Sequence, residues 1–119
     1  MITFEKVNTE TKKVVEEMFA SHGLNKKEVQ YCIKVDDTYI GVIDYIVQGE
    51  HAILSNLMIH FDYQGYGYGT NTYFTLEEMM KHRNIKDIQV LQGDVTEQAK
   101  PFIEGLGFIL NGEMYIKSF

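Results

Sequence analysis

The stretch YQGYGYGT, residues 63–70, with glycines at 65, 67 and 69, constrains the fold of this chain more than any other feature. The apolar run before it is typical of a strand, and the run after it has the periodicity of a helix. Glycine tolerates positive φ angles, and a glycine-rich turn between strand and helix exposes backbone N–H groups at the positive end of the helix. The stretch therefore predicts an anion site, best suited to phosphate, or else a tight connection that binds nothing.

Two common nucleotide-binding motifs do not fit this stretch. A phosphate-binding Walker loop requires Gly-Lys-Ser/Thr, and Gly69-Thr70 lacks the lysine. The dinucleotide motif G-x-G-x-x-G would require glycine at position 70 or 72, and both positions are threonine. The loop also carries no Lys or Arg, so an anion would be bound by N–H groups and the helix dipole.

The rest of the chain reads as alternating strands and helices without a linker, repeat or low-complexity segment. Strands are expected over 1–7, 29–35, 39–47, 51–60, 86–92 and a final hairpin over 108–119 with an Asn111-Gly112 turn. Helices are expected over 10–22, 71–83 and 96–107, and the last starts late or kinks because Pro101 removes one N–H after its first turn. The apolar faces of the first two helices consist of Val14, Val15, Met18 and Phe19 and of Tyr73, Leu76 and Met80. A strand, helix and strand in succession form a crossover, so strands 51–60 and 86–92 should be parallel. The order β-α-β-β-β-α-β-α-β-β predicts an α/β fold with a mixed, mostly antiparallel sheet flanked by helices.

Composition and charge narrow the class of partner. The 119 residues suffice for one domain, and their net charge of -6 argues against a nucleic-acid partner. No apolar run approaches the length that spans a bilayer, so we expect no membrane partner. One cysteine excludes a disulfide framework and suits the cytoplasm, where we expect the protein. The histidines at 22, 60 and 82 are scattered, and no metal site is expected.

Three segments together resemble the GNAT acetyltransferase superfamily. QGYGYG, residues 64–69, matches the acetyl-CoA signature Q/R-x-x-G-x-G/A, and LMI, residues 57–59, resembles the family's fourth strand. TEQAKPFIEGLGF, residues 96–108, is similar to the later N-x-x-A-x-x-F-Y-x-x-x-G-F helix. The spacing holds from about Gly41 to Phe108, so we expect residues 1–119 to form a single GNAT-like acyl-CoA-binding domain.

This resemblance implies acetyl-CoA as cosubstrate and direct attack of a neutral primary amine on its thioester. The glycine loop would wrap the pyrophosphate, the strand at 57–59 would bond the pantetheine, and the N–H of Ile59 would polarise the thioester carbonyl. The expected cofactor-binding residues are Leu57, Met58, Ile59, Gln64, Gly65, Tyr66, Gly67, Tyr68, Gly69, Thr70 and Thr96.

The catalytic groups of that family are not all present here. Ile103 stands where the family often has a tyrosine acid, and Ile53 stands where some members have a glutamate base. His51 and Ser55 share the strand face of Ile53. In one interpretation His51 is the base and Ser55 holds a water; in the other His51 is an exposed residue and Ser55 is a core hydroxyl. Asp44, in an otherwise apolar strand, is a further candidate base unless it is bonded beside a turn.

Three functions follow for comparison. The leading one is an acetyl-CoA-dependent N-acetyltransferase acting on a primary amine. The second is a catalytically weakened acyl-CoA-binding or regulatory module with the same fold, and the third is an interaction protein with an empty loop. About 20 residues between the first two strands leave room for one helix, where the family usually has two. The acceptor groove is therefore open, or is completed by a second subunit in a homodimer.

Overall fold

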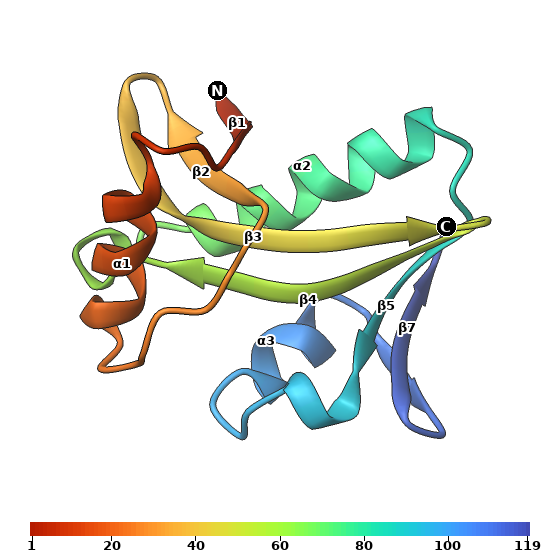
Figure 1. The fold of residues 1–119 in the computed structure, drawn as a ribbon. Coiled ribbons are helices and arrows are strands. Elements are labelled where there is room, and N and C mark those ends of the chain that lie inside the picture. The colour runs from red at the N-terminus through yellow and green to blue at the C-terminus, as the bar shows by residue number, and fades with distance from the viewer. The chain divides into compact units, whose positions relative to one another are not determined.

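The computed structural model describes residues 1–119, and Figure 1 follows the chain through its elements. The strands are β1 (Ile2–Lys6), β2 (Tyr31–Val35), β3 (Thr38–Gln48), β4 (His51–Ile59), β5 (Asp87–Leu91), β6 (Ile109–Asn111) and β7 (Met114–Ser118). The helices are α1 (Lys12–Ser21), α2 (Tyr68–His82) and α3 (Lys100–Gly105), with short 3-10 helices η1 (Phe61–Tyr63) and η2 (Gln92–Asp94). This order of strands and α-helices confirms the predicted one.

The strands form a seven-stranded sheet in the order β1-β2-β3-β4-β5-β7-β6. The pairs β1–β2, β2–β3, β5–β7 and β6–β7 are antiparallel, whereas β4 and β5 are parallel. The crossover through α2 accounts for the parallel pair, because strands joined by a hairpin must run antiparallel. The predicted fold class, a mixed and mostly antiparallel sheet with flanking helices, is confirmed.

The chain divides into two compact units, one of Met1–Asp44 with Asn56–Thr75 and one of Tyr45–Ser55 with Leu76–Phe119. The single domain over residues 1–119 stays a prediction. No helix combines the length and hydropathy that crossing a bilayer requires.

In the first unit, α1 buries the apolar face that its sequence predicts. Val15, Met18 and Phe19 are buried and form one cluster with Cys32 of β2 and Val42 of β3. Each large apolar side chain that is fully buried contributes about 1.5–3 kcal/mol, so this cluster anchors the helix to its strands. The C-terminal turn of α1 is thereby held in one place.

The first unit also contains a close approach between β3 and the end of β4. A Cβ atom at Gly41 would overlap the carbonyl oxygen of Met58, so only glycine fits there. The N–H of His60 donates to the carbonyl of Ile40 at 2.8 Å. Because successive residues of an extended strand present their N–H and C=O groups to opposite edges, those of Ile59 point away from β3.

In the second unit, β4 and β5 pair over a short register that runs from His51–Asp87 to Ile53–Gln89. Both strands continue beyond it, β4 to Ile59 and β5 to Leu91. The C-terminal half of α2 buries Leu76 and Met80 completely, as its periodicity predicts.

In the second unit, one of the two alternatives for the last helix is confirmed, and the predicted turn of the final hairpin is wrong. Helix α3 begins at Lys100 rather than near residue 96, because Pro101 fits only the first turn, where its missing N–H costs nothing. In the final hairpin Asn111 pairs with Met114, so the turn residues are Gly112 and Glu113 rather than Asn111 and Gly112. Gly112 supplies the positive φ, +62°, that the tight turn requires.

Candidate functional site

The predicted anion loop has the backbone conformation that its glycines allow. Gly65 and Gly67 have φ angles of +85° and +83°, in the left-handed region that other residues avoid. A Cβ at either position would meet no atom within 4 Å, so the φ angle, not space, demands glycine. Gly69 differs, because it lies inside the first turn of α2.

Helix α2 begins directly after this loop and directs its first N–H groups at the same place. The N–H of Asn71 donates to the carbonyl of Gly67 at 3.0 Å, which is the first bond of the helix. The N–H groups of Tyr68, Gly69 and Thr70 therefore have no acceptor inside the helix, and they lie at its positive end. Tyr66 is 73% exposed, and its ring lies 6.4 Å from that of Tyr68. The loop thus offers donors and an aromatic surface to a ligand.

The carbonyl oxygen of Ile59, at the end of β4, accepts hydrogen bonds from two side chains. His22 Nε2 lies 2.7 Å from this oxygen and Gln64 Nε2 lies 3.1 Å from it. His22 caps the C-terminus of α1, and Gln64 opens the glycine loop. Gln64 was predicted to bind the cofactor, and its side chain here is bonded to Ile59. No pattern in the sequence pointed to His22, since its partner is far away in the chain.

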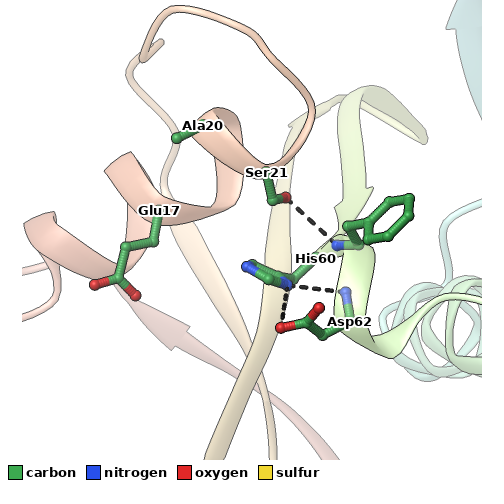
Figure 2. Close-up of a pocket in the computed structure, with 6 residues that line it drawn as sticks. Glu17, Ala20, Ser21, His60 and Asp62 are labelled. Atoms are coloured by element: carbon green, nitrogen blue, oxygen red, sulfur yellow. Dashed lines mark hydrogen bonds and ion pairs between the residues drawn. The ribbon is translucent and has the colours of Figure 1, made fainter.

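A solvent-open hollow of about 490 Å³ lies beside this junction, between α1 and the segment after β4. Its lining residues are Glu17, Ala20, Ser21, His60, Phe61 and Asp62. Figure 2 shows two bonds that shape it: Ser21 Oγ accepts from the N–H of Phe61 at 3.4 Å, and His60 Nδ1 accepts from that of Asp62 at 3.0 Å. Two carboxylates and no lysine or arginine line the hollow, which suits a cationic group.

The three predicted catalytic residues lie in different surroundings. His51 Nδ1 lies 2.9 Å and 3.0 Å from the two carboxylate oxygens of Asp87, to which Gln89 Nε2 also donates at 3.2 Å. Ser55 is an exposed residue of β4. Asp44 is half-buried and accepts from Gln30 Nε2 at 2.8 Å. No result here tests their catalytic roles, which stay predictions.

The remaining candidates have clear structural positions. Thr96 is exposed, and its Oγ1 accepts from the N–H of Ala99 at 3.1 Å, which stabilises the turn before α3. Ile103 is buried, so an apolar core side chain occupies the position of the family's usual tyrosine. Burial, with a smaller effect of Glu5, raises the pKa of the Cys32 thiol, which disfavours the thiolate that a nucleophile requires. No group of three or more His, Cys, Asp or Glu side chains is arranged to hold a metal ion.

Comparison with known proteins supports the fold and gives the family. The structure resembles that of an acetyltransferase from Thermus thermophilus, with a TM-score of 0.78, 16% identity and coverage of 100% of this chain and 97% of that one. PaiA N-acetyltransferase from Thermoplasma acidophilum, in complex with coenzyme A, has a TM-score of 0.70 and 16% identity, with coverage of 100% of this chain and 99% of that one. The ribosomal-protein-S18-alanine N-acetyltransferase from Escherichia coli has a TM-score of 0.73 and 16% identity, with coverage of 93% of this chain and 79% of that one.

The sequence itself carries the family assignment. No curated protein sequence matches this chain significantly. The profile of the Acetyltransferase (GNAT) family, in contrast, matches residues 2–108, which include the glycine loop and the segment up to Phe108. The resemblance inferred from the three segments is therefore confirmed, and the chain belongs to the GNAT family of acetyltransferases.

Proposed function

We propose that this chain is an acetyl-CoA-dependent N-acetyltransferase that moves an acetyl group to a primary amine by direct attack. The observation that carries the proposal is the glycine loop: Gly65 and Gly67 are left-handed immediately before the free N–H groups of α2. This geometry fits a pyrophosphate, which backbone N–H groups and a helix N-terminus bind without basic side chains. PaiA, a protein of similar fold, was crystallised with coenzyme A, which supports the same donor here.

The end of β4 would hold the pantetheine arm of the donor. The register with β5 runs only from His51 to Ile53, whereas β4 continues to Ile59. An extended ligand can pair, as an added strand does, with the main chain of Leu57 and Ile59, which alternation places on the edge away from β3. The carbonyl of Ile59 is an acceptor that binds His22 and Gln64, and the N–H of Ile59 is the main-chain donor that could bind the thioester oxygen.

Chemistry would then follow from positioning and from charge stabilisation. The bound donor supplies an activated acetyl group, and a neutral amine must reach its carbonyl carbon. The Ile59 N–H stabilises the oxyanion, and holding both reactants together supplies much of the rate. His51, Ser55 and Asp44 stay candidates for proton transfer. Because Ile103 cannot donate a proton, solvent protonates the leaving thiolate.

We expect the acceptor to bind beside the segment between β1 and β2, which contains few elements. One helix, α1, lies between β1 and β2, and residues 22–30 form no helix. The acidic hollow at Glu17 and Asp62 would attract a protonated amine. We propose that a second copy of the chain completes this side in a homodimer in the cytoplasm, which a solution mass equal to one chain at working concentration would exclude.

One observation favours the second candidate, a catalytically weakened acyl-CoA-binding module. Ile103 is buried where a proton donor would stand, so part of the usual chemistry is missing. Both candidates require coenzyme binding, and only turnover separates them.

Thermal unfolding with acetyl-CoA, with ATP and NAD as controls, tests the proposal first. At 100 times its dissociation constant a ligand stabilises by about 2.7 kcal/mol, a shift of roughly ten degrees for a domain of this size. Thioester consumption is then measured over primary amines: an alkylamine, a polyamine, an aminoglycoside and a peptide with a free N-terminus. A shift with turnover supports the transferase, a shift without turnover supports the binding module, and no shift excludes both.

A further inference from the structure

We propose that His22, in the loop after α1, is the catalytic base that takes the proton of the acceptor amine. This inference rests on the function proposed above. It starts from one contact, the 2.7 Å bond between His22 Nε2 and the carbonyl oxygen of Ile59. The same residue, Ile59, is the one whose N–H would hold the thioester oxygen.

The contact fixes the tautomer of the ring. A carbonyl oxygen accepts hydrogen bonds and donates none, so His22 Nε2 must carry the hydrogen. In the neutral ring Nδ1 then carries the lone pair and can accept a proton. A histidine oriented by one nitrogen and reactive at the other is the usual arrangement of a base in proteins. Gln64 shares the same oxygen, which keeps Gln64 Nε2 3.3 Å from His22 Nε2.

The contact also fixes where the ring lies. In an extended residue the N–H and the C=O groups point to the same edge of the strand, so the N–H of Ile59 faces the side on which His22 binds. A thioester oxygen held by that N–H would lie close to the imidazole. The C-cap position of His22 on α1, whose face is anchored in the core, holds the ring at this edge.

The proton balance of the step is simple. As the amine nitrogen bonds to the carbonyl carbon and the C–S bond breaks, the amine loses one proton and the thiolate gains one. His22 Nδ1 takes the proton from the amine, and the imidazolium returns it to the thiolate through solvent. The ionisable side chains that line the hollow beside this junction are Glu17 on α1 and His60 and Asp62 after β4. Helix α1 also carries Lys12, Lys13 and Glu16.

His22 and His51, the base predicted from the sequence, differ in their position relative to Ile59. His51 begins β4 and Ile59 ends it. A base must reach the proton that it removes within hydrogen-bond distance or through one water. His22 is in contact with Ile59 itself.

Two substitutions separate a base from a residue that only supports the backbone. His22→Gln keeps an N–H that can donate to the Ile59 carbonyl but has no basic nitrogen, whereas His22→Ala loses both. We expect each to lower kcat/KM for the amine by about 10²-fold or more. We also expect each to remove the part of the fall of kcat/KM toward acidic pH that comes from His22, and to leave the part that protonation of the amine itself causes. His82→Gln is the matched control, because His82 also bonds a backbone carbonyl, that of Glu78, at 3.1 Å. It should leave the rate unchanged.

Two further readouts do not depend on turnover. Titration calorimetry should give a Kd for acetyl-CoA within about threefold of wild type in His22→Gln, because the base acts on the amine. Long-range ¹H–¹⁵N NMR of the neutral ring should show the hydrogen of His22 on Nε2. A hydrogen on Nδ1, or wild-type kcat/KM and pH profile in His22→Gln, would overturn the inference. Wild-type protein that binds no acetyl-CoA, or binds it and acetylates no amine, would instead remove the proposed transferase.

Discussion

Two regions of this molecule use polar side chains in different ways. At the junction of β4 and the glycine loop, in the first unit, side chains bond the main chain: His22 and Gln64 the Ile59 carbonyl, and Ser21 the Phe61 N–H. In the second unit, two contacts between charged or ionisable side chains stand out. Glu77 of α2 lies 2.9 Å from Lys117 and 3.1 Å from Lys81, and His51 bonds Asp87.

The two bonding patterns have different structural consequences. A bond from a side chain to the main chain fixes a peptide orientation, which a site built from backbone N–H groups requires. An ion pair between side chains joins two elements but leaves the backbone direction to the sheet and helix. We therefore expect changes in the first region to alter binding and chemistry, and changes in the second to alter stability alone.

The largest effect on stability should come from Glu77→Gln. The Glu77 side chain is 8% exposed and that of Lys117 is 19% exposed, so the substitution removes a carboxylate that lies 2.9 Å from a largely buried ammonium. Hydrogen bonds to charged groups contribute about 1.5–3 kcal/mol, and we expect a loss of about 2 kcal/mol in urea unfolding. Glu78→Gln is the control, because Glu78 is exposed and 3.9 Å from Lys81. Weaker acetyl-CoA binding by the folded Glu77→Gln variant would contradict the expectation that changes in the second region alter stability alone.

A smaller loss of stability, with a large loss of binding, should follow Gly67→Ala. Alanine at φ +83° costs about 1–2 kcal/mol and displaces the N–H groups of the loop. Gly49→Ala is a matched control, since Gly49 also has a positive φ, +61°, and an equally open Cβ position, but lies in the turn between β3 and β4. Both variants should lose similar stability, and only Gly67→Ala should raise the Kd of acetyl-CoA, by about tenfold. Equal affinities in both would contradict the assignment of the loop.

The elements were predictable from the sequence because their signals are local. The periodicity of α1 and α2 indicated their buried faces, and the glycines indicated a turn that needs positive φ. The crossover rule predicted the parallel pair of β4 and β5. Where the signal was not local, the prediction failed by about one residue: the register of β6 on β7 places the last turn at Gly112 and Glu113.

The candidate site was predictable in its backbone and not in its side chains. The signature at 64–69 located the loop, but nothing in it indicates that Gln64 turns back to Ile59. The bond from His22 to Ile59 joins residues far apart in the sequence, and only the packing of α1 on its strands brings them together. A single sequence offers no pattern for such a pair.

The smallest effect on stability should come from Asp87→Asn, which bears most directly on the choice between two histidines. His51 is half exposed, so its contact with Asp87 contributes less than about 1 kcal/mol, and asparagine still accepts from Nδ1. If His22 is the base, kcat/KM should stay within about twofold of wild type. If His51 is the base, losing the carboxylate that orients its ring should lower kcat/KM by about 10²-fold or more, as removing the orienting group of a catalytic histidine does. Steady-state rates of Asp87→Asn and His22→Gln, measured at one pH with the same amine, show which of the two histidines is the base.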